Sequence, residues 1–125
     1  MAYADIAFFV ALAKESDHLK GPAQTALERH GRDLTTSVVT VLEALLIAER
    51  KGIDPELLVG SIFKLTRVDG ITPEEALLAA RLVKNRTLNA FDAMHGVLSR
   101  GDPILTSDRR IGVAGFTVIS LNGGR

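Results

Sequence analysis

Residues 89–108, NAFDAMHGVLSRGDPILTSD, carry the pattern that decides the fold. Asn89 is a favoured helix-capping residue, and apolar side chains recur after it at helical spacing as far as Leu98. A turn at Gly101-Asp102 leads into residues 103–106, whose composition is typical of a buried strand. Asp108 stands just beyond the end of that strand. The stretch therefore predicts a helix followed by a buried strand, with a carboxylate directly after the strand.

The same alternation of helix and short strand extends toward both ends of the chain. Strands are predicted over about 2–5, 34–36, 103–106 and 116–121, and helices over about 6–13, 22–30, 38–50, 55–68, 73–85 and 90–98. The clearest helix start is at Thr72, where Pro73 follows and Glu75 completes a capping box. Short strands separated by longer helices predict an α/β fold, a three-layer α/β/α sandwich in which helices cover both faces of a short central parallel sheet.

Length and composition limit the possible classes of protein. The 125 residues fit a single domain spanning 1–125, and 46% of them are hydrophobic, enough for a sizeable core. The absence of cysteine excludes thiol catalysis, zinc–thiolate centres and cysteine-bound iron–sulfur clusters, and is compatible with a reducing cytoplasm. The longest apolar run, residues 6–13, is too short to cross a bilayer, and no basic segment precedes it. Neither a membrane span nor a signal peptide is expected.

The charges are balanced overall but unevenly distributed. Residues 1–75 contain eight Lys and Arg against twelve Asp and Glu, whereas residues 76–125 contain seven against three. The basic C-terminal part can face a polyanion such as RNA, or it can simply be a solvated surface.

Four acidic residues are expected to converge at one edge of the predicted sheet. Asp5 ends the first strand, Asp108 follows the strand at 103–106, and Asp92 lies in the first turn of the helix before that strand. Glu43 lies about two turns into the helix after residues 34–36. In parallel sheets, ligands bind outside the carboxyl ends of the strands. Carboxylates gathered there repel one another, so the cluster predicts a bound divalent cation, Mg²⁺ or Mn²⁺.

Each acid also has an explanation that needs no metal. Asp5 can cap the helix after it, Asp92 is favoured by its helix dipole, and Asp108 can be an ordinary turn residue. The apolar residues of the helix that carries Glu43 form a stripe at helical spacing: Val38, Val41, Leu42, Leu45, Leu46 and Ala48. Glu43 has the apolar neighbours Val39, Leu42, Leu46 and Ile47 and is therefore expected close to an otherwise buried stripe. A carboxylate there is costly unless it is paired, metal-bound or solvated at the rim. The joint placement of the four acids favours the metal site.

Four motifs contain these acids. They read YADIAFF at residues 3–9, TSVVTVLE at 36–43, FDAMHG at 91–96 and ILTSD at 104–108. In their order and spacing they resemble the motifs of PIN-domain ribonucleases of the VapC toxin type. The similarity covers essentially the whole chain.

The resemblance implies a PIN-like fold and a divalent-metal-dependent endoribonuclease, in which a metal-activated water hydrolyses an RNA phosphodiester bond. It assigns catalytic and metal-ligand roles to Asp5, Glu43, Asp92 and Asp108. Thr106 matches the family's hydroxyl position beside the last acid, and is expected to support the acids or contact the substrate. A cytoplasmic toxin with a cognate antitoxin and a second copy of itself as partners is also implied. The apolar helices at 57–65 and 76–83 are expected to leave a groove for such partners.

Three further residues near the acids have expected roles of their own. Arg109 and Arg110 directly follow the last acid, so their guanidinium groups can bind RNA phosphates or remain solvated. His95 lies three residues after Asp92 on the same helical face. Because hard-cation sites rarely need imidazole, His95 is expected to pack against or hydrogen-bond a neighbour.

Departures from the family pattern keep other functions open. Ile6 and Ala7 stand where small polar side chains usually follow the first acid, and Arg110 stands where many relatives have a further acid. These differences count against the binding of a second metal ion and against full activity. The alternative is a catalytically weak or inactive PIN-like module that acts by binding RNA or protein. A phosphotransfer domain is disfavoured, because Ala7 replaces the second Asp of haloacid-dehalogenase-type phosphatases and no late strand supplies the Lys of a receiver domain.

Overall fold

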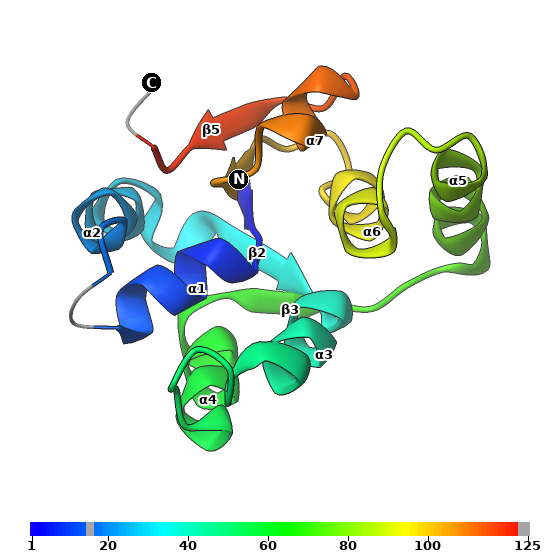
Figure 1. Cartoon of the computed structure of the whole chain (residues 1–125). Coiled ribbons are helices and arrows are strands. Elements are labelled where there is room, and N and C mark those ends of the chain that lie inside the picture. The colour runs from blue at the N-terminus through cyan, green and yellow to red at the C-terminus, as the bar shows by residue number, and fades with distance from the viewer. Residues whose placement is uncertain (15–16, 123–125) are drawn as a thin grey trace.

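One parallel sheet forms the centre of the protein (Figure 1). The computed structural model describes residues 1–14 and 17–122, except for the side chain of Arg109. Within them, five strands are arranged in the order β3-β2-β1-β4-β5, and all neighbours are parallel. The strands are β1 (Ala2–Ala4), β2 (Leu34–Ser37), β3 (Arg67–Asp69), β4 (Ile104–Thr106) and β5 (Val118–Ser120). The helices are α1 (Ile6–Ala13), α2 (Lys20–His30), the 3-10 helix η1 (Gly31–Asp33), α3 (Val38–Ile47), α4 (Pro55–Leu65), α5 (Pro73–Lys84), α6 (Ala90–Leu98) and α7 (Arg109–Val113). None of these described helices is both long and apolar enough to cross a membrane.

Helices cover both faces of the sheet, which confirms the predicted α/β/α sandwich. Ala2, Ala4 and Leu105 face a larger apolar core formed with α1, α2 and α4. Tyr3 and Ile104, which alternate with them along β1 and β4, face a second core formed with α6 and α7. Helix α5 packs on the outside of α6 (Figure 1).

Local capping signals set the helix starts as the sequence predicts. Asp54 caps α4, where its carboxylate accepts a hydrogen bond from the Glu56 amide at 2.8 Å. Thr72 and Glu75 form the predicted capping box at the start of α5. The side chain of Asn89 caps α6. These interactions stay within four residues of the chain, so the sequence alone is enough to specify them.

The prediction of one helix over 55–68 is wrong at its end. Helix α4 ends at Leu65, and the Thr66 hydroxyl donates a hydrogen bond to the carbonyl of Ile62 at 2.6 Å. Arg67–Asp69 then pairs with β2 as the edge strand β3. An edge strand with charged residues lacks the apolar pattern of a buried strand, so the sequence pattern does not predict β3.

The prediction that an apolar stripe of α3 beside Glu43 is buried is right for Val39, which is 8% exposed, but wrong for Leu42 and Leu46. Four large residues of α3 are between 44% and 59% exposed: Val38, Leu42, Leu45 and Leu46. Small or β-branched residues of α3 face the core instead, namely Val39, Thr40 and Ala44. Helical periodicity defines an apolar face but does not say whether the protein's own core covers it.

The two helices expected to share a groove lie apart. Helix α4 packs against α1 and α3, whereas α5 packs against α6. Each therefore lines a separate pocket with different neighbours.

Candidate active site

The four predicted acids line one pocket of about 460 Å³. Asp5 follows β1 directly and Asp108 stands two residues after β4, and these two strands are neighbours in the sheet. Glu43 projects from the second turn of α3 and Asp92 from the first turn of α6. The topology therefore brings all four carboxylates together at the carboxyl edge of the sheet.

Asp5 is both a helix cap and a buried pocket residue. Its carboxylate accepts a hydrogen bond from the Ala7 amide at 2.9 Å, and it is 5% exposed. Burial raises the pKa of Asp5 to about 6, although the charge of His95 and a hydrogen bond from Thr106 act in the opposite direction. A cation in the pocket would therefore favour the ionised form of Asp5.

Asp92 and Asp108 share one cation of the protein, the guanidinium of Arg110. The Nε and Nη2 atoms of Arg110 lie 3.2 and 3.0 Å from the two oxygens of Asp108, and Nη2 is 3.6 Å from Asp92 Oδ2. The hydrogen bond from Arg110 lowers the pKa of Asp108. Burial and the neighbouring Asp108 raise the pKa of Asp92 to about 6. Asp92 Oδ2 is buried and has no hydrogen-bond partner in the part of the chain described, so this oxygen remains available to a ligand.

Glu43 is paired with a buried histidine. Its Oε1 lies 2.8 Å from His95 Nε2, and the His95 side chain is 1% exposed. Burial by itself lowers the pKa of His95, but the bond to Glu43 and the nearby Asp5 charge outweigh it and raise that pKa to about 10. The expectation that His95 hydrogen-bonds a neighbour is confirmed. The identity of its partner, 52 residues away, has no signal in the sequence.

The chemistry of the pocket fits a hard divalent cation. It offers carboxylate oxygens from four residues, and the orphaned Oδ2 of Asp92 is a buried acceptor without a donor. Among residues 1–14 and 17–122, no three His, Asp or Glu side chains are grouped closely enough to hold a metal ion. Arg110 pairs with the Asp92 and Asp108 carboxylates instead, and His95 bonds one oxygen of Glu43. A bound cation would have to draw the acids together and displace Arg110.

Comparison with known proteins identifies the fold. The PIN domain family matches residues 2–116. The chain belongs to the PIN domain family. No curated protein matches the chain. Among solved structures, this PIN domain resembles VapC20 of Mycobacterium tuberculosis, described as a sarcin–ricin loop cleaving toxin, with a TM-score of 0.79 and 21% identity over 94% of this chain and 97% of that one.

Two further structures have the same fold. A toxin–antitoxin complex from Klebsiella pneumoniae gives a TM-score of 0.75 at 16% identity, covering 97% of this chain and 98% of the other. FitAcB from Neisseria gonorrhoeae gives 0.74 at 18% identity, with the same coverage of 97% and 98%. PIN domains are generally nucleases, so membership of the family supports a nuclease.

Other predicted residues of this PIN domain lie around the acids. Thr106 is 2% exposed, and its hydroxyl accepts a hydrogen bond from the Asp108 amide at 2.9 Å. Ile6 and Ala7 line the pocket beside Asp5, where they contribute no side-chain hydrogen bond. Arg110 lies at the rim with its side chain 70% exposed. The side chain of Arg109 is outside the described part of the structure.

Proposed function

We propose that this PIN domain is a divalent-metal-dependent endoribonuclease, the toxin of a VapBC-type toxin–antitoxin pair acting in the cytoplasm. In this proposal the whole chain, residues 1–125, acts as one domain. The observation that carries the proposal is the pocket itself, in which four carboxylates meet and a buried oxygen of Asp92 has no donor. Membership of the PIN family and the shared fold with toxin structures support the same conclusion.

In this proposal, Asp5, Glu43, Asp92 and Asp108 hold Mg²⁺ or Mn²⁺. A bound ion supplies positive charge near the scissile phosphate and lowers the pKa of a water molecule. Thr106 helps to hold the acids in place. Its hydroxyl accepts a hydrogen bond from the Asp108 amide, and its hydrogen bond to Asp5 lowers the pKa of that carboxyl. Ionised carboxylates are the forms that bind metal, so this bond favours the binding form of Asp5.

Arg109 and Arg110 are proposed to contact RNA phosphates. The Arg110 side chain is exposed, and its ion pairs with Asp92 and Asp108 are of a kind that contributes little in water. A metal ion on these acids would compete with the guanidinium of Arg110. The released side chain would then be free for a phosphate at the rim of the pocket.

The decisive experiment is RNA turnover by the purified protein. We expect cleavage of single-stranded RNA with Mg²⁺ or Mn²⁺, and no cleavage with EDTA. Asp5→Asn and Asp108→Asn keep the side-chain size but remove a negative ligand, so each should abolish most turnover while the fold survives. The control for contaminating nuclease is the Asp108→Asn protein prepared in the same way. Equal degradation by both proteins, or none with any divalent ion, would overturn the proposal.

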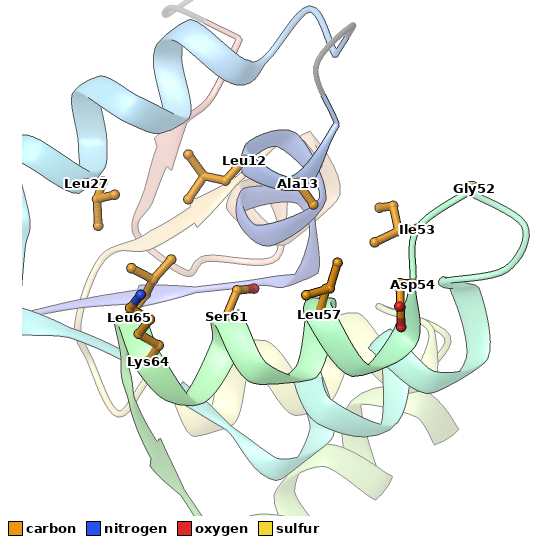
Figure 2. A pocket seen from close by; sticks show the side chains of 10 residues that line it. All are labelled: Leu12, Ala13, Leu27, Gly52, Ile53, Asp54, Leu57, Ser61, Lys64 and Leu65. Atoms are coloured by element: carbon orange, nitrogen blue, oxygen red, sulfur yellow. The ribbon is translucent and has the colours of Figure 1, made fainter.

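We further propose that an antitoxin segment binds the groove between α1, α2 and α4. This groove has a volume of about 570 Å³, and Figure 2 shows side chains of α4 facing those of α1 and α2 across it. Its lining is largely apolar, and Leu57 at its edge is 72% exposed. Toxin–antitoxin complexes among the structural relatives support such a partner. Leu57→Asp should weaken binding of the antitoxin and leave RNA turnover unchanged.

The exposed apolar face of α3 is the proposed homodimer interface. Leu42, Leu45 and Leu46 are each more than half exposed. Monomeric proteins rarely expose large contiguous apolar patches, and such patches usually mark sites where another protein binds. Light scattering after gel filtration should give a dimer for the wild type and a monomer for Leu45→Glu.

One observation favours the alternative function, a binding module without catalysis. In the described residues, Arg110 pairs with two of the acids, Asp92 and Asp108, and no ready-made group of metal ligands is present. Ile6 and Ala7 also provide no polar side chain beside Asp5. Such a module would bind RNA or a partner protein without turning RNA over, and the turnover experiment separates the two functions.

A further inference from the structure

A buried chain of hydrogen bonds runs from the sheet to the acid pocket. The Ser37 hydroxyl lies 2.7 Å from the Tyr3 hydroxyl, which lies 2.8 Å from His95 Nδ1. On the other side of the ring, His95 Nε2 lies 2.8 Å from Glu43 Oε1. Ser37, Tyr3 and His95 are each no more than 1% exposed. Solvent therefore does not compete with the Ser37–Tyr3 and Tyr3–His95 bonds.

The chemistry of the groups fixes the direction of the bond to Glu43. A carboxylate can only accept, so His95 Nε2 carries the hydrogen and donates it to Oε1. Behind the ring, Tyr3 comes from β1 and Ser37 from the end of β2, two neighbouring strands in the sheet. The Tyr3 and His95 rings also contact each other, with centroids 5.6 Å apart. The imidazole is thus anchored on rigid elements and cannot turn without breaking this chain.

Glu43 needs such an anchor because of its position. It lies on α3 between residues that face outward, including Leu42 and Leu46 at more than half exposed. A glutamate there has three rotatable side-chain bonds, and holding it in one rotamer costs conformational entropy. The bond from His95 holds one oxygen of Glu43 and leaves the other unoccupied by His95.

We propose that His95 is a positioning residue, which holds the Glu43 carboxylate in the orientation that binds a divalent cation, while the Tyr3 hydroxyl fixes the imidazole. This inference rests on the proposed metal-dependent function and adds to it a residue whose two ring nitrogens are both engaged by protein groups. Partners of this kind behind a metal ligand typically contribute about 10- to 100-fold to metal affinity.

The test measures Mn²⁺ affinity of the intact protein by titration calorimetry, without RNA. In His95→Gln, the amide nitrogen is the same number of bonds from the backbone as Nε2 and can still donate to Glu43. In His95→Asn, the nitrogen is placed like Nδ1 and cannot reach it. We expect His95→Asn to weaken Mn²⁺ binding by about 10- to 100-fold and His95→Gln to recover most of that loss. Tyr3→Phe, which removes only a hydroxyl, should cause a smaller loss.

A second series places the same changes in a Glu43→Gln background. If His95 acts through Glu43, His95→Asn should have no further effect there beyond about twofold. His18→Gln is the matched control, because the His18 side chain is 85% exposed and should leave Mn²⁺ affinity unchanged. Thermal unfolding of each variant without metal checks that it is folded.

Several outcomes would overturn the inference. Wild-type affinity in His95→Asn would do so, as would equal losses for Asn and Gln, or a full loss that persists in the Glu43→Gln background. Each of these outcomes would overturn the role of His95 without contradicting the proposed metal site. A wild-type protein that binds no divalent ion would instead overturn the proposed function and this inference together.

Discussion

Two carboxylates occupy the same position in neighbouring helices, and their environments are opposite. Glu75 is the third residue of α5 and Asp92 is the third residue of α6. The backbone amide of each donates to the side chain of its capping residue, at 3.2 Å to Thr72 and at 2.9 Å to Asn89. Locally, the two helix starts are built in the same way.

The two side chains then find different partners. Glu75 accepts a hydrogen bond from the Thr72 amide at 3.0 Å, and Arg100 Nε donates to it at 2.7 Å. The bond from Arg100 lowers the pKa of Glu75 to about 2. Asp92 is one methylene shorter and faces the pocket, where Oδ2 has no donor within the described residues and burial raises the pKa to about 6. Both oxygens of Glu75 are hydrogen-bonded by the protein, whereas the Oδ2 atom of Asp92 has only a longer ion pair, 3.6 Å from Arg110, and can still accept from a ligand.

The two carboxylates contribute differently to stability and to ligand binding. A paired carboxylate at a helix start stabilises the folded state, because the helix dipole and the Arg100 guanidinium favour its charge. A carboxylate with a buried oxygen that has no hydrogen-bond donor lowers stability until a cation binds it. Changing each of the two acids in turn therefore tests the assignment of the site.

The largest effect is expected on RNA turnover. Asp92→Asn should reduce turnover by about 100-fold or more, since even outer partners of a metal site contribute 10- to 100-fold. Glu75→Gln is the matched control and should keep wild-type turnover, because Glu75 faces Arg100 and not the pocket. Initial rates on a labelled single-stranded RNA with Mn²⁺ measure both. Equal rates for the two variants would show that Asp92 contributes no more to RNA turnover than Glu75 does.

A second effect is expected on metal-dependent stability. A divalent ion binds the folded cluster and not the dispersed acids of the unfolded chain, so Mn²⁺ should raise the melting temperature of the wild type. At 100 times the dissociation constant the gain is about 2.7 kcal/mol, which corresponds to several degrees. Glu75→Gln should show the same rise and Asp92→Asn little or none. A rise of equal size in all three proteins would contradict a site at Asp92.

The two acids should shift stability with pH in opposite directions. Folded Asp92 holds its proton up to a pKa of about 6 against the usual 3.8, so the metal-free protein should lose stability as pH rises through this window. Glu75 has a folded pKa of about 2 against 4.5, so its contribution is full above pH 4.5 and is lost as pH falls toward 2.

Urea unfolding with EDTA between pH 2 and 7 measures these contributions. Asp92→Asn should become more stable than the wild type only as pH rises above about 4. Glu75→Gln should be less stable than the wild type at neutral pH and approach it near pH 2. A pH-independent difference in either variant would show that its carboxylate does not titrate as described.

The smallest effects are expected from the two arginines that pair with these acids. Arg100 also donates to the Gly70 carbonyl at 3.2 Å and so joins three segments of the surface. Arg100→Gln should lower the free energy of unfolding by about 1 kcal/mol. Arg110→Gln should leave stability nearly unchanged, but should weaken RNA binding and reduce the slope of RNA affinity against salt by about one. Measuring RNA affinity at several salt concentrations distinguishes the two.

Local sequence signals were enough to predict most of the helices and strands and the order of the acids. Asn89, the Thr72 capping box and the buried strand at 103–106 are readable because each signal lies within a few neighbouring residues. The four acids could be assigned to one edge of the sheet for a similar reason. Each stands at a known distance from a strand end or a helix start, and parallel strands end at the same edge.

The partners of the individual side chains depend on packing between distant segments and could not be predicted from the sequence. The Tyr3–His95 and His95–Glu43 bonds join residues 92 and 52 positions apart, so no local pattern encodes them. Likewise, no local pattern shows that α3 presents its large apolar residues outward, or that the charged segment Arg67–Asp69 completes the sheet as an edge strand. Periodicity in a sequence tells which residues share a face. Packing between distant segments decides whether that face is covered by the core, by solvent or by a partner.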